Sequence, residues 1–411
     1  QYTHLIGRKI RELGLFCEIK PPIYLNSLKI LNNHAALILS GGPDSVLSKK
    51  SPSLKIDVSQ ITLPILGICY GFQYIAHKLG GKIINKGNRE YGNTTIETLA
   101  SNILFDKTPR SQTVWMSHGD SLNKLPKNFK VIAKTKNNII AAITNNKNIY
   151  ALQFHPEVTH SENGKNILSN FLFKFSKLKK NWTDTNLDNN VKKYLAFSIE
   201  EKNPNIICAV SGGVDSTVLA FALSKHLSSK NIHFVFVNNG LLRKYDEANI
   251  RKIFKSFKLK LNVIDAQNIF VKKLKNIKDP ERKRKIIGSL FIDVFNNYIK
   301  SLKKKSFYLA QGTLYTDIIE STSYHGGKSA TIKSHHNVGG LPKDINFNII
   351  EPFKELFKDE VRKLGLYYKL NKEFISRHPF PGPGLGIRCI GSITKERLDT
   401  LREIDEIFIK Y

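Results

Sequence analysis

Residues 67–73 read GICYGFQ, which places a cysteine between two glycines where a strand is expected to turn into a helix. The apolar run 61–68 predicts a buried strand, and residues 72–79 have a helical pattern. The flanking glycines permit tight backbone geometry and close approach of a substrate. A thiolate at a helix N-terminus is favoured by the helix dipole and by N–H groups, so Cys69 is a candidate nucleophile.

A second turn of this kind lies at 211–217, which reads SGGVDST between a predicted strand, 206–210, and a predicted helix, 217–227. The backbone N–H groups of such a loop can hold a phosphate, with added attraction from the helix dipole. The loop lacks the lysine that ends the usual nucleotide-binding loop. An isolated SGG would be as consistent with an ordinary glycine turn, but the complete string is more specific.

Further apolar runs alternate with helical patterns along the chain. Strands are predicted at 35–39, 149–154, 232–237 and 306–310, a helix at 163–175, and a polar linker at 177–190. This alternation predicts an α/β protein with two mostly parallel-sheet domains in tandem. Because no repeat relates the two halves, we expect two different active sites.

Composition sets broader bounds. A chain of 411 residues is too long for one ordinary core, and no apolar run reaches the length needed to cross a bilayer. The four cysteines are far apart and form no CxxC pair, which favours reduced thiols and a cytoplasmic location. The net charge of +30 is consistent with a nucleic-acid surface, but the lysines are dispersed beside abundant asparagine. We therefore favour compositional drift by about three to one and expect no nucleic-acid or membrane partner.

The thiol needs a base, and His155 follows a predicted strand end with Glu157 two residues on. Alone, Cys69 would more often be a core residue and His-Pro-Glu a turn, but their joint occurrence at strand ends reverses that preference. GxCYGxQ with FHPEV resembles the class I glutamine amidotransferase family over about 1–176. The resemblance makes Cys69 the nucleophile, His155 the base and then acid, and Glu157 its orienting carboxylate. It also implies an oxyanion hole at the N–H groups of Gly42 and Tyr70, and glutamine binding by Gln73, Ser117 and His118, although His118 alone could be a surface histidine.

SGGVDST resembles the loop of the ATP pyrophosphatases, which cleave ATP between the α- and β-phosphates. The resemblance implies an ATP site that comprises Ser211, Gly212, Gly213, Val214, Asp215, Ser216, Thr217, Val237 and Gly312. It also implies that Asp215 helps to hold Mg²⁺, a hard cation suited to carboxylate and phosphate oxygens.

Four further strings separate the pyrophosphatases. They are DPERKRKIIG at 279–288, QGTLY at 311–315, IKSHHNVGGLP at 332–342 and RHPFPGPGL at 377–385. All four resemble the GMP synthetase family, so the resemblance spans nearly the whole chain. It implies that XMP attacks ATP to form an adenylyl-XMP intermediate, and that ammonia from glutamine then gives GMP, AMP and pyrophosphate.

Residue roles in the acceptor half are also implied by this resemblance. Arg284 is expected to bind the XMP phosphate, since guanidinium matches phosphate oxygens; a lid or XMP contact is expected at Lys333, His335, His336 and Asn337. The alternatives are a solvated charge run at 283–285 and a plain loop pair at the two histidines. Zinc is rejected, because no cysteine or acidic partner stands at ligand spacing.

The resemblance divides the chain into an amidotransferase domain at 1–180, an ATP pyrophosphatase domain at 181–380 and the start of a C-terminal dimerisation domain at 381–411. A first strand before residue 1 and the rest of the last domain are expected outside the sequence, and the enzyme is expected to be a homodimer. Two positions depart from the family pattern: Asn238 replaces Asp and Thr316 replaces Pro, which puts nucleotide affinity or metal placement in doubt.

Two other functions stay open. The first is another amidotransferase-coupled ligase with a different acceptor, against which the strings at 332–342 and 377–385 argue. The second is an RNA-binding or tRNA-modifying protein, which should carry a second catalytic cysteine near the loop. Cys208 precedes the loop inside a predicted strand, which favours a structural role.

Overall fold

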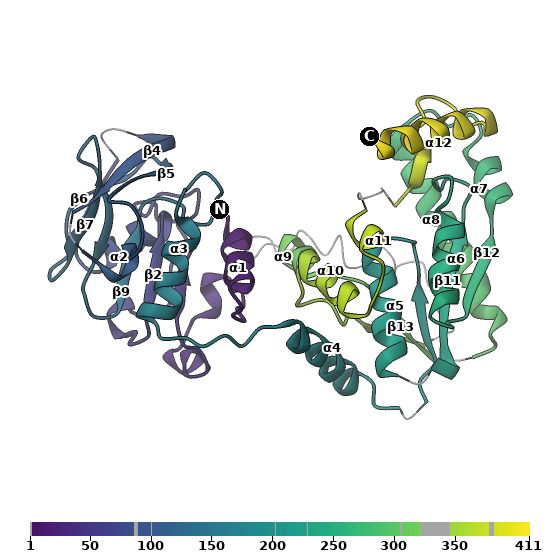
Figure 1. The fold of residues 1–411 in the computed structure, drawn as a ribbon, viewed down its shortest axis with the longest axis horizontal. Helices are drawn as coiled ribbons and strands as arrows, with labels where there is room; N and C mark the ends of the chain where they lie inside the picture. The colour runs from purple at the N-terminus through teal and green to yellow at the C-terminus, as the bar shows by residue number, and fades with distance from the viewer. Residues whose placement is uncertain are drawn as a thin grey trace. The chain divides into compact units, whose positions relative to one another are not determined.

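The computed structural model describes residues 2–85, 89–99, 101–201, 203–227, 229–304, 306–321, 346–377 and 382–411. Contacts divide the chain into two compact units, Gln1–Thr183 and Asp184–Tyr411 (Figure 1). No helix in these described ranges is long and apolar enough to cross a bilayer.

The first unit is built on a mixed seven-stranded sheet in the order β1-β2-β9-β8-β7-β4-β5. Its strands are β1 (Leu37–Leu39), β2 (Ile65–Ile68), β9 (Ile149–Leu152), β8 (Ile140–Thr144), β7 (Lys130–Thr135), β4 (Glu90–Thr98) and β5 (Ser111–His118). The pairs β1–β2 and β2–β9 are parallel, and the other four pairs are antiparallel. A separate antiparallel pair joins β3 (Lys82–Ile84) to β6 (Ser121–Lys124).

The helices of this unit cover the two faces of its sheet. They are α1 (Thr3–Glu12), α2 (Tyr70–Lys78) and α3 (Gly164–Ser169), which continues into a π-helical turn, Asn170–Phe175. Short 3₁₀ turns lie at Pro22–Tyr24, Leu28–Asn33, Val58–Gln60 and Ile103–Phe105.

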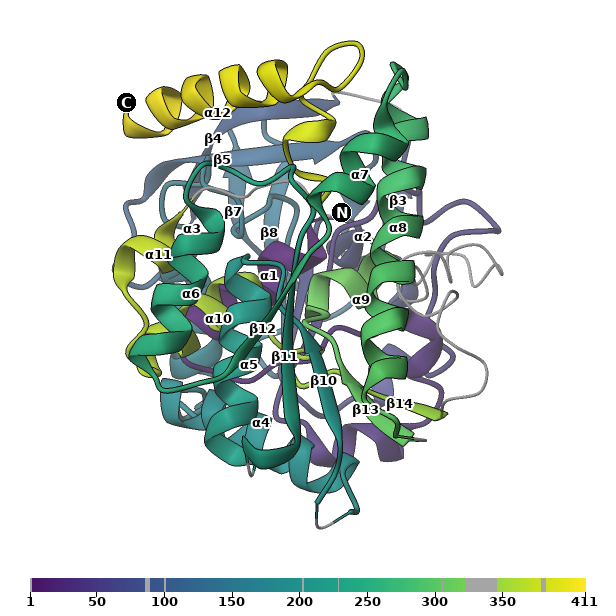
Figure 2. The same ribbon diagram turned by 90° about the vertical axis from the view of Figure 1, so that its right-hand side faces the viewer.

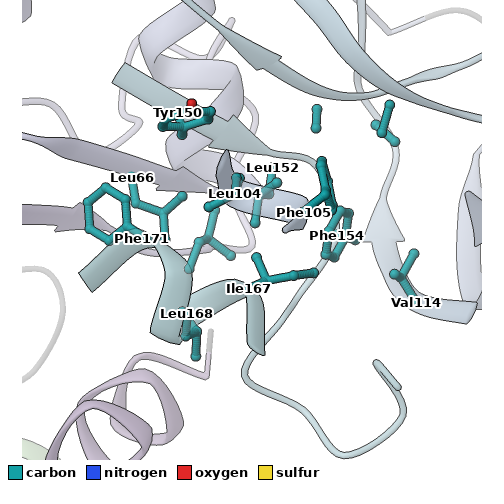
Figure 3. Close-up of a cluster of buried hydrophobic side chains, with 14 of the residues drawn as sticks. Leu66, Leu104, Phe105, Val114, Tyr150, Leu152, Phe154, Ile167, Leu168 and Phe171 are labelled. Carbon is teal, nitrogen blue, oxygen red and sulfur yellow. The ribbon is translucent and has the colours of Figure 1, made fainter. Parts of the chain in front are cut away.

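Strand β2 shows how the core is divided. Its alternate residues Leu66 and Ile68 pack into one apolar cluster with α1 and α3, shown in Figure 3, while Ile65 packs with α2 in the other. This is the two-residue period of a strand buried on both faces. Full burial of each large apolar side chain contributes about 1.5–3 kcal/mol, so the parallel core holds the ends of β2 and β9 firmly.

The second unit has a five-stranded parallel sheet in the order β12-β11-β10-β13-β14. Its strands are β10 (Ile206–Ala209), β11 (Ile232–Asn238), β12 (Leu261–Asp265), β13 (Ser306–Ala310) and β14 (Asn346–Ile350). Its helices are α4 (Asp184–Ser198), α5 (Val214–His226), α6 (Asp246–Ser256), α7 (Gln267–Leu274), α8 (Pro280–Ser301), α9 (Tyr315–Ser321), α10 (Lys358–Tyr367), α11 (Lys372–Ser376) and α12 (Lys395–Lys410), with 3₁₀ turns at Ser229–Asn231 and Gly384–Gly386.

The arrangement of these elements defines a crevice. Figure 2 shows α5 and α8 on opposite sides of the strands, and an apolar cluster joins α8 to β10, β11 and β13. The strand order runs outward in both directions from β10. Ligands of open α/β sheets bind at the carboxyl ends of strands where the order reverses, which here is the end of β10.

The predicted α/β organisation is confirmed, with three corrections of detail. The first sheet is mixed, because its later strands return as antiparallel neighbours. The predicted linker 177–190 is wrong beyond Thr183, since a helix begins at Asp184. The helix after the second glycine turn begins at Val214, three residues earlier than predicted. Residues 381–411 belong to the second unit, and a separate domain starting there stays a prediction.

Candidate active sites

Cys69 occupies the single residue between β2 and α2, with φ 53° and ψ −104°. This conformation is strained for a residue with a side chain and persists only where the surroundings hold it. The Cys69 N–H donates to Leu152 O at 2.7 Å, and its carbonyl accepts from Gln73 N at 3.1 Å. The turn is therefore fixed at both ends, and it presents the thiol at the first turn of α2.

Glycine is needed at Gly71 because α2 rests directly on the end of β1. A Cβ there would lie 2.0 Å from Leu39 O, which is shorter than any real contact. The close approach brings the loop after β1, which contains Gly42, beside the Cys69 turn. Tyr70 is the first residue of α2, and the N–H groups of a first helical turn point out of the helix end. This placement fits the oxyanion hole predicted at Gly42 and Tyr70, which stays a prediction.

His155 and Glu157 form a fully buried pair just beyond β9. His155 Nδ1 donates to Glu157 Oε1 at 2.7 Å, and both side chains have no exposed surface. The backbone of His155 is also fixed, since its N–H donates to Trp115 O at 3.0 Å and its carbonyl accepts from Ser161 Oγ at 2.6 Å. The imidazole therefore has one orientation, with Nδ1 committed to the carboxylate.

A close helix contact keeps this turn in place. A Cβ on Gly164, the first residue of α3, would lie 1.8 Å from Pro156 O, so only glycine lets α3 pack there. The second imidazole nitrogen, Nε2, makes no conventional hydrogen bond within the described part of the chain. Cys69 is nevertheless near enough to act on His155 electrostatically.

The pKa of His155 follows from these neighbours. Burial alone lowers it, but hydrogen bonding to Cys69 and Glu157 and attraction to the same two groups raise it from 6.5 to about 9. At neutral pH the imidazole is therefore protonated and can stabilise a thiolate at Cys69.

We expect hydrolysis of glutamine to weaken as pH rises through about 9, because the imidazolium that protonates departing ammonia is then lost. The folded state binds this proton more tightly than the unfolded chain. The associated stability is therefore complete below pH 6.5 and is lost as pH rises through about 9. The measurement is kcat/KM for glutamine against pH.

The control for this pH profile is Glu157→Gln, which removes one group that raises the pKa of His155. Its alkaline limb should move to lower pH. An unchanged limb in this variant would show that another group controls the profile.

The loop 117–120 lines the same region. Cys69 Sγ donates to Ser117 O at 3.5 Å, and Gln73 Nε2 donates to Asp120 O at 3.0 Å. The buried imidazole of His118 has its own partners, with Nδ1 2.9 Å from Asp120 O and Nε2 3.4 Å from Glu90 Oε2. The structure thus brings Gln73, Ser117 and His118 together at the thiol. Glutamine binding by each of them stays a prediction, and the imidazole of His118 is already engaged inside the unit.

The second site begins where β10 ends. Gly212 has φ +78°, the left-handed conformation that favours glycine. Ser211 Oγ accepts from Gly213 N at 3.2 Å and lies 3.0 Å from Ser216 Oγ, while Thr217 Oγ1 donates to Gly213 O at 2.8 Å. These bonds hold the loop against the first turn of α5, which is the geometry that binds phosphate.

Asp215 connects this loop to two distant segments. Its Oδ2 lies 3.0 Å from Lys358 Nζ at the start of α10, and a Cβ on Gly312 would lie 3.7–3.8 Å from Asp215 atoms. Its Oδ1 is buried and has no hydrogen-bond partner among the described residues. The predicted phosphate loop and Gly312 are therefore brought together, and a cation that the sequence analysis missed stands beside them. Lys358 has no local motif to mark it among many lysines, since it is 143 residues from its partner.

The other predicted positions are less tightly gathered. Val237 is buried near the carboxyl end of β11. Asn238 donates to the Glu247 carboxylate and accepts from Gly240 N at 2.9 Å. An aspartate at 238 would face Glu247 with like charge, so asparagine suits this local pair.

The charged string at the start of α8 needs a correction. Lys283 is buried, because its Nζ donates to Cys389 O at 2.6 Å and Gly391 O at 2.7 Å, so the run 283–285 is not uniformly solvated. Arg284 is exposed and paired with Glu281 at 2.5 Å, and XMP binding by Arg284 stays a prediction.

Some predictions fall outside the site geometry. The predicted lid residues Lys333, His335, His336 and Asn337 lie outside the described residues. Cys208 is fully buried, which raises the pKa of its thiol to about 12 and fits an inert structural thiol. Across the part of the chain that the structure describes, no group of three or more His, Cys, Asp or Glu residues could hold a metal ion.

Comparison with known proteins agrees with this geometry. The family described as "Glutamine amidotransferase class-I" matches residues 1–175, so the first unit is a class I glutamine amidotransferase module. A "GMP synthase [glutamine-hydrolyzing]" from Brachyspira hyodysenteriae is 47% identical over 412 residues, covering 100% of this chain and 79% of the relative. The corresponding protein from Fusobacterium nucleatum is 46% identical over 416 residues, covering 100% of this chain and 80% of the relative. The chain belongs to the glutamine-hydrolysing GMP synthase family, which confirms the predicted family and enzyme class.

Among solved structures, one described as a GMP synthase component from Thermoplasma acidophilum is similar to the first part of the chain. It is 30% identical, with a TM-score of 0.36, and the match covers 42% of this chain and 86% of that one. The TM-score is too low for a structural argument.

Proposed function

We propose that Cys69, His155 and Glu157 release ammonia from glutamine, and that the loop 211–217 with Lys358 activates XMP with ATP. The observation that carries the proposal is the presence of both sites in one chain. A cysteine–histidine–carboxylate set stands in the first unit, and a phosphate loop with a carboxylate–lysine pair stands in the second.

In the first half-reaction, the Cys69 thiolate attacks the side-chain carbonyl of glutamine. The N–H groups of Gly42 and Tyr70 stabilise the oxyanion, and the His155 imidazolium gives its proton to the departing ammonia. The resulting thioester is hydrolysed by water, which His155 deprotonates, so glutamate leaves and the thiol is restored. Glu157 keeps Nδ1 protonated, so that Nε2 is the nitrogen that carries the transferred proton.

In the second half-reaction, the XMP O2 atom attacks the α-phosphorus of ATP, and the bond to pyrophosphate breaks. The loop amides and Lys358 hold the departing pyrophosphate by its negative charge. Ammonia then attacks the activated carbon, AMP leaves, and GMP forms. The residues fit Mg²⁺, because Asp215 Oδ1 is a buried carboxylate oxygen without a hydrogen-bond partner among the described residues. When bound, the ion would neutralise phosphate charge at Asp215.

Two broader properties belong to the same proposal. The four cysteines are all free thiols, which fits a reducing compartment such as the cytoplasm. Helix α12 exposes Ile404, Ile407 and Phe408, an apolar face that fits contact with a second copy of the chain in a homodimer.

The test is the stoichiometry of the full-length protein with XMP, Mg-ATP and glutamine. We expect one AMP and one pyrophosphate to be released for each GMP, with XMP required for both. A protein that releases no AMP when XMP is present, but does so with another acceptor, would be a different amidotransferase-coupled ligase.

A further inference from the structure

Helix α4, at the start of the second unit, has a polar side chain on its buried face. The buried residues of this helix are Leu187, Asp188, Val191 and Leu195, and it packs against α5 and α10. A buried carboxylate is costly unless it is paired. Its partners therefore indicate what α4 holds in place.

Asp188 clamps the carboxyl ends of two helices. Its carboxylate accepts from Lys225 Nζ and His226 Nε2, both at 2.8 Å, at the end of α5. It also accepts from the hydroxyl of Tyr368 at 2.7 Å, directly after α10. Burial and this carboxylate raise the pKa of Tyr368, so the phenol stays protonated and donates.

The opposite ends of the same two helices meet at the phosphate site. Asp215 lies in the first turn of α5 and Lys358 is the first residue of α10, with their charged atoms 3.0 Å apart. Between the two ends, a Cβ on Gly365 of α10 would lie 2.9 Å from a methyl of Val218, which shows how closely the helices pack. The helices run in the same direction, and Asp188 fixes their relative register from about 15–20 Å away along their axes.

Tyr194 of α4 holds the third segment that approaches Asp215. Its hydroxyl accepts from Glu351 N at 3.0 Å, and the Glu351 carboxylate accepts from Thr313 Oγ1 at 2.6 Å. Thr313 follows Gly312, which lies beside Asp215. Thus α4 contacts, directly or through one residue, each segment that converges on Asp215.

We propose that Asp188 and Tyr194 are positioning residues for ATP activation, which set the distances among Asp215, Lys358 and the loop 311–313. The inference rests on the proposed function of the second unit. It assigns to α4 a role in the geometry of the pyrophosphate site, although α4 touches no substrate.

The first test compares Tyr194→Phe with Tyr298→Phe in ammonia-driven GMP formation. The matched control removes a hydroxyl that lies 3.4 Å from His233 Nδ1, at the amino end of β11 and away from the phosphate loop. We expect Tyr194→Phe to raise KM for Mg-ATP about fivefold, the size of one lost hydrogen bond, while Tyr298→Phe leaves KM unchanged. Equal KM values in two variants of equal Tm would overturn the role of Tyr194.

The second test is a double-mutant cycle with Asp188→Asn and Lys358→Ala. Asp188→Asn should raise KM for Mg-ATP about tenfold in the wild-type background and less than about twofold once Lys358 is gone, because the two act through one geometry. Effects that multiply independently would show that Asp188 supports only the fold. Wild-type protein that released no pyrophosphate from ATP with XMP and ammonia would instead refute the proposed function itself.

Discussion

Replacing Cys69 by alanine abolishes GMP formation from glutamine and leaves formation from free ammonia intact. The expected loss with glutamine is at least about a thousandfold, because no other group can form the thioester. The Cys69 turn has φ 53°, and alanine keeps the Cβ, so the variant adds no new backbone strain. The measurements are GMP formation with each nitrogen source and acid-trapped labelled glutamyl-enzyme.

Ammonia-driven synthesis serves as the internal control in the same preparation. If Cys69→Ala lost both activities while keeping the wild-type Tm, the two sites would not be separable. If glutamine use survived, the nucleophile would lie elsewhere. Glu157→Gln is the graded companion, since it keeps the thiol and removes only the carboxylate that orients His155.

Local patterns were sufficient for the elements that carry the two motifs. The strand–turn–helix at Cys69 was predicted because a buried strand, a glycine on each side of the turn and a helical period are all contained in about twenty residues. The same is true of the loop 211–217, although α5 begins three residues before the predicted start. There the first turn of the helix is itself part of the phosphate loop, so composition could not separate loop from helix.

The failures concern residues whose role depends on distant partners. The polar stretch 177–190 was interpreted as linker, because Asp188 has no apolar pattern, yet Asp188 is buried by bonds to residues 37 to 180 positions away. Lys283 was grouped with a solvated charge run, but two backbone carbonyls more than 100 residues away hold it in the core. Periodicity reports the faces of an element and does not report which charges will find partners across the fold.

The mixed first sheet has a related explanation. Strands β4, β7 and β8 are antiparallel neighbours, and nothing in the alternation of strand and helix before Cys69 predicts that the chain later returns as hairpins. The catalytic turn was nevertheless correctly placed, because only β1, β2 and β9 position it, and these three are parallel.

Replacing Asp215 by asparagine eliminates GMP formation from both glutamine and ammonia. We expect a loss of about 100-fold or more, comparable with removal of one charge-stabilising group from a transition state. Asparagine keeps the shape but provides no negative charge for Mg²⁺ or for Lys358. Pyrophosphate release with XMP and ammonia is the measurement, and labelling of Cys69 by an electrophilic glutamine analogue should be unchanged.

The partner variants decide which function of Asp215 matters. Lys358→Ala should weaken activity by removing the cation that faces the departing pyrophosphate, and Lys358→Arg should restore part of it, since the charge returns with a different geometry. If Asp215 only neutralised Lys358, the double variant would recover activity, because neither charge would be left unpaired. We expect no recovery, since the buried Oδ1 of Asp215, which has no hydrogen-bond partner in the described part of the chain, implies a role beyond its ion pair. Recovery in the double variant would reduce Asp215 to a structural partner and remove the proposed metal site from this carboxylate.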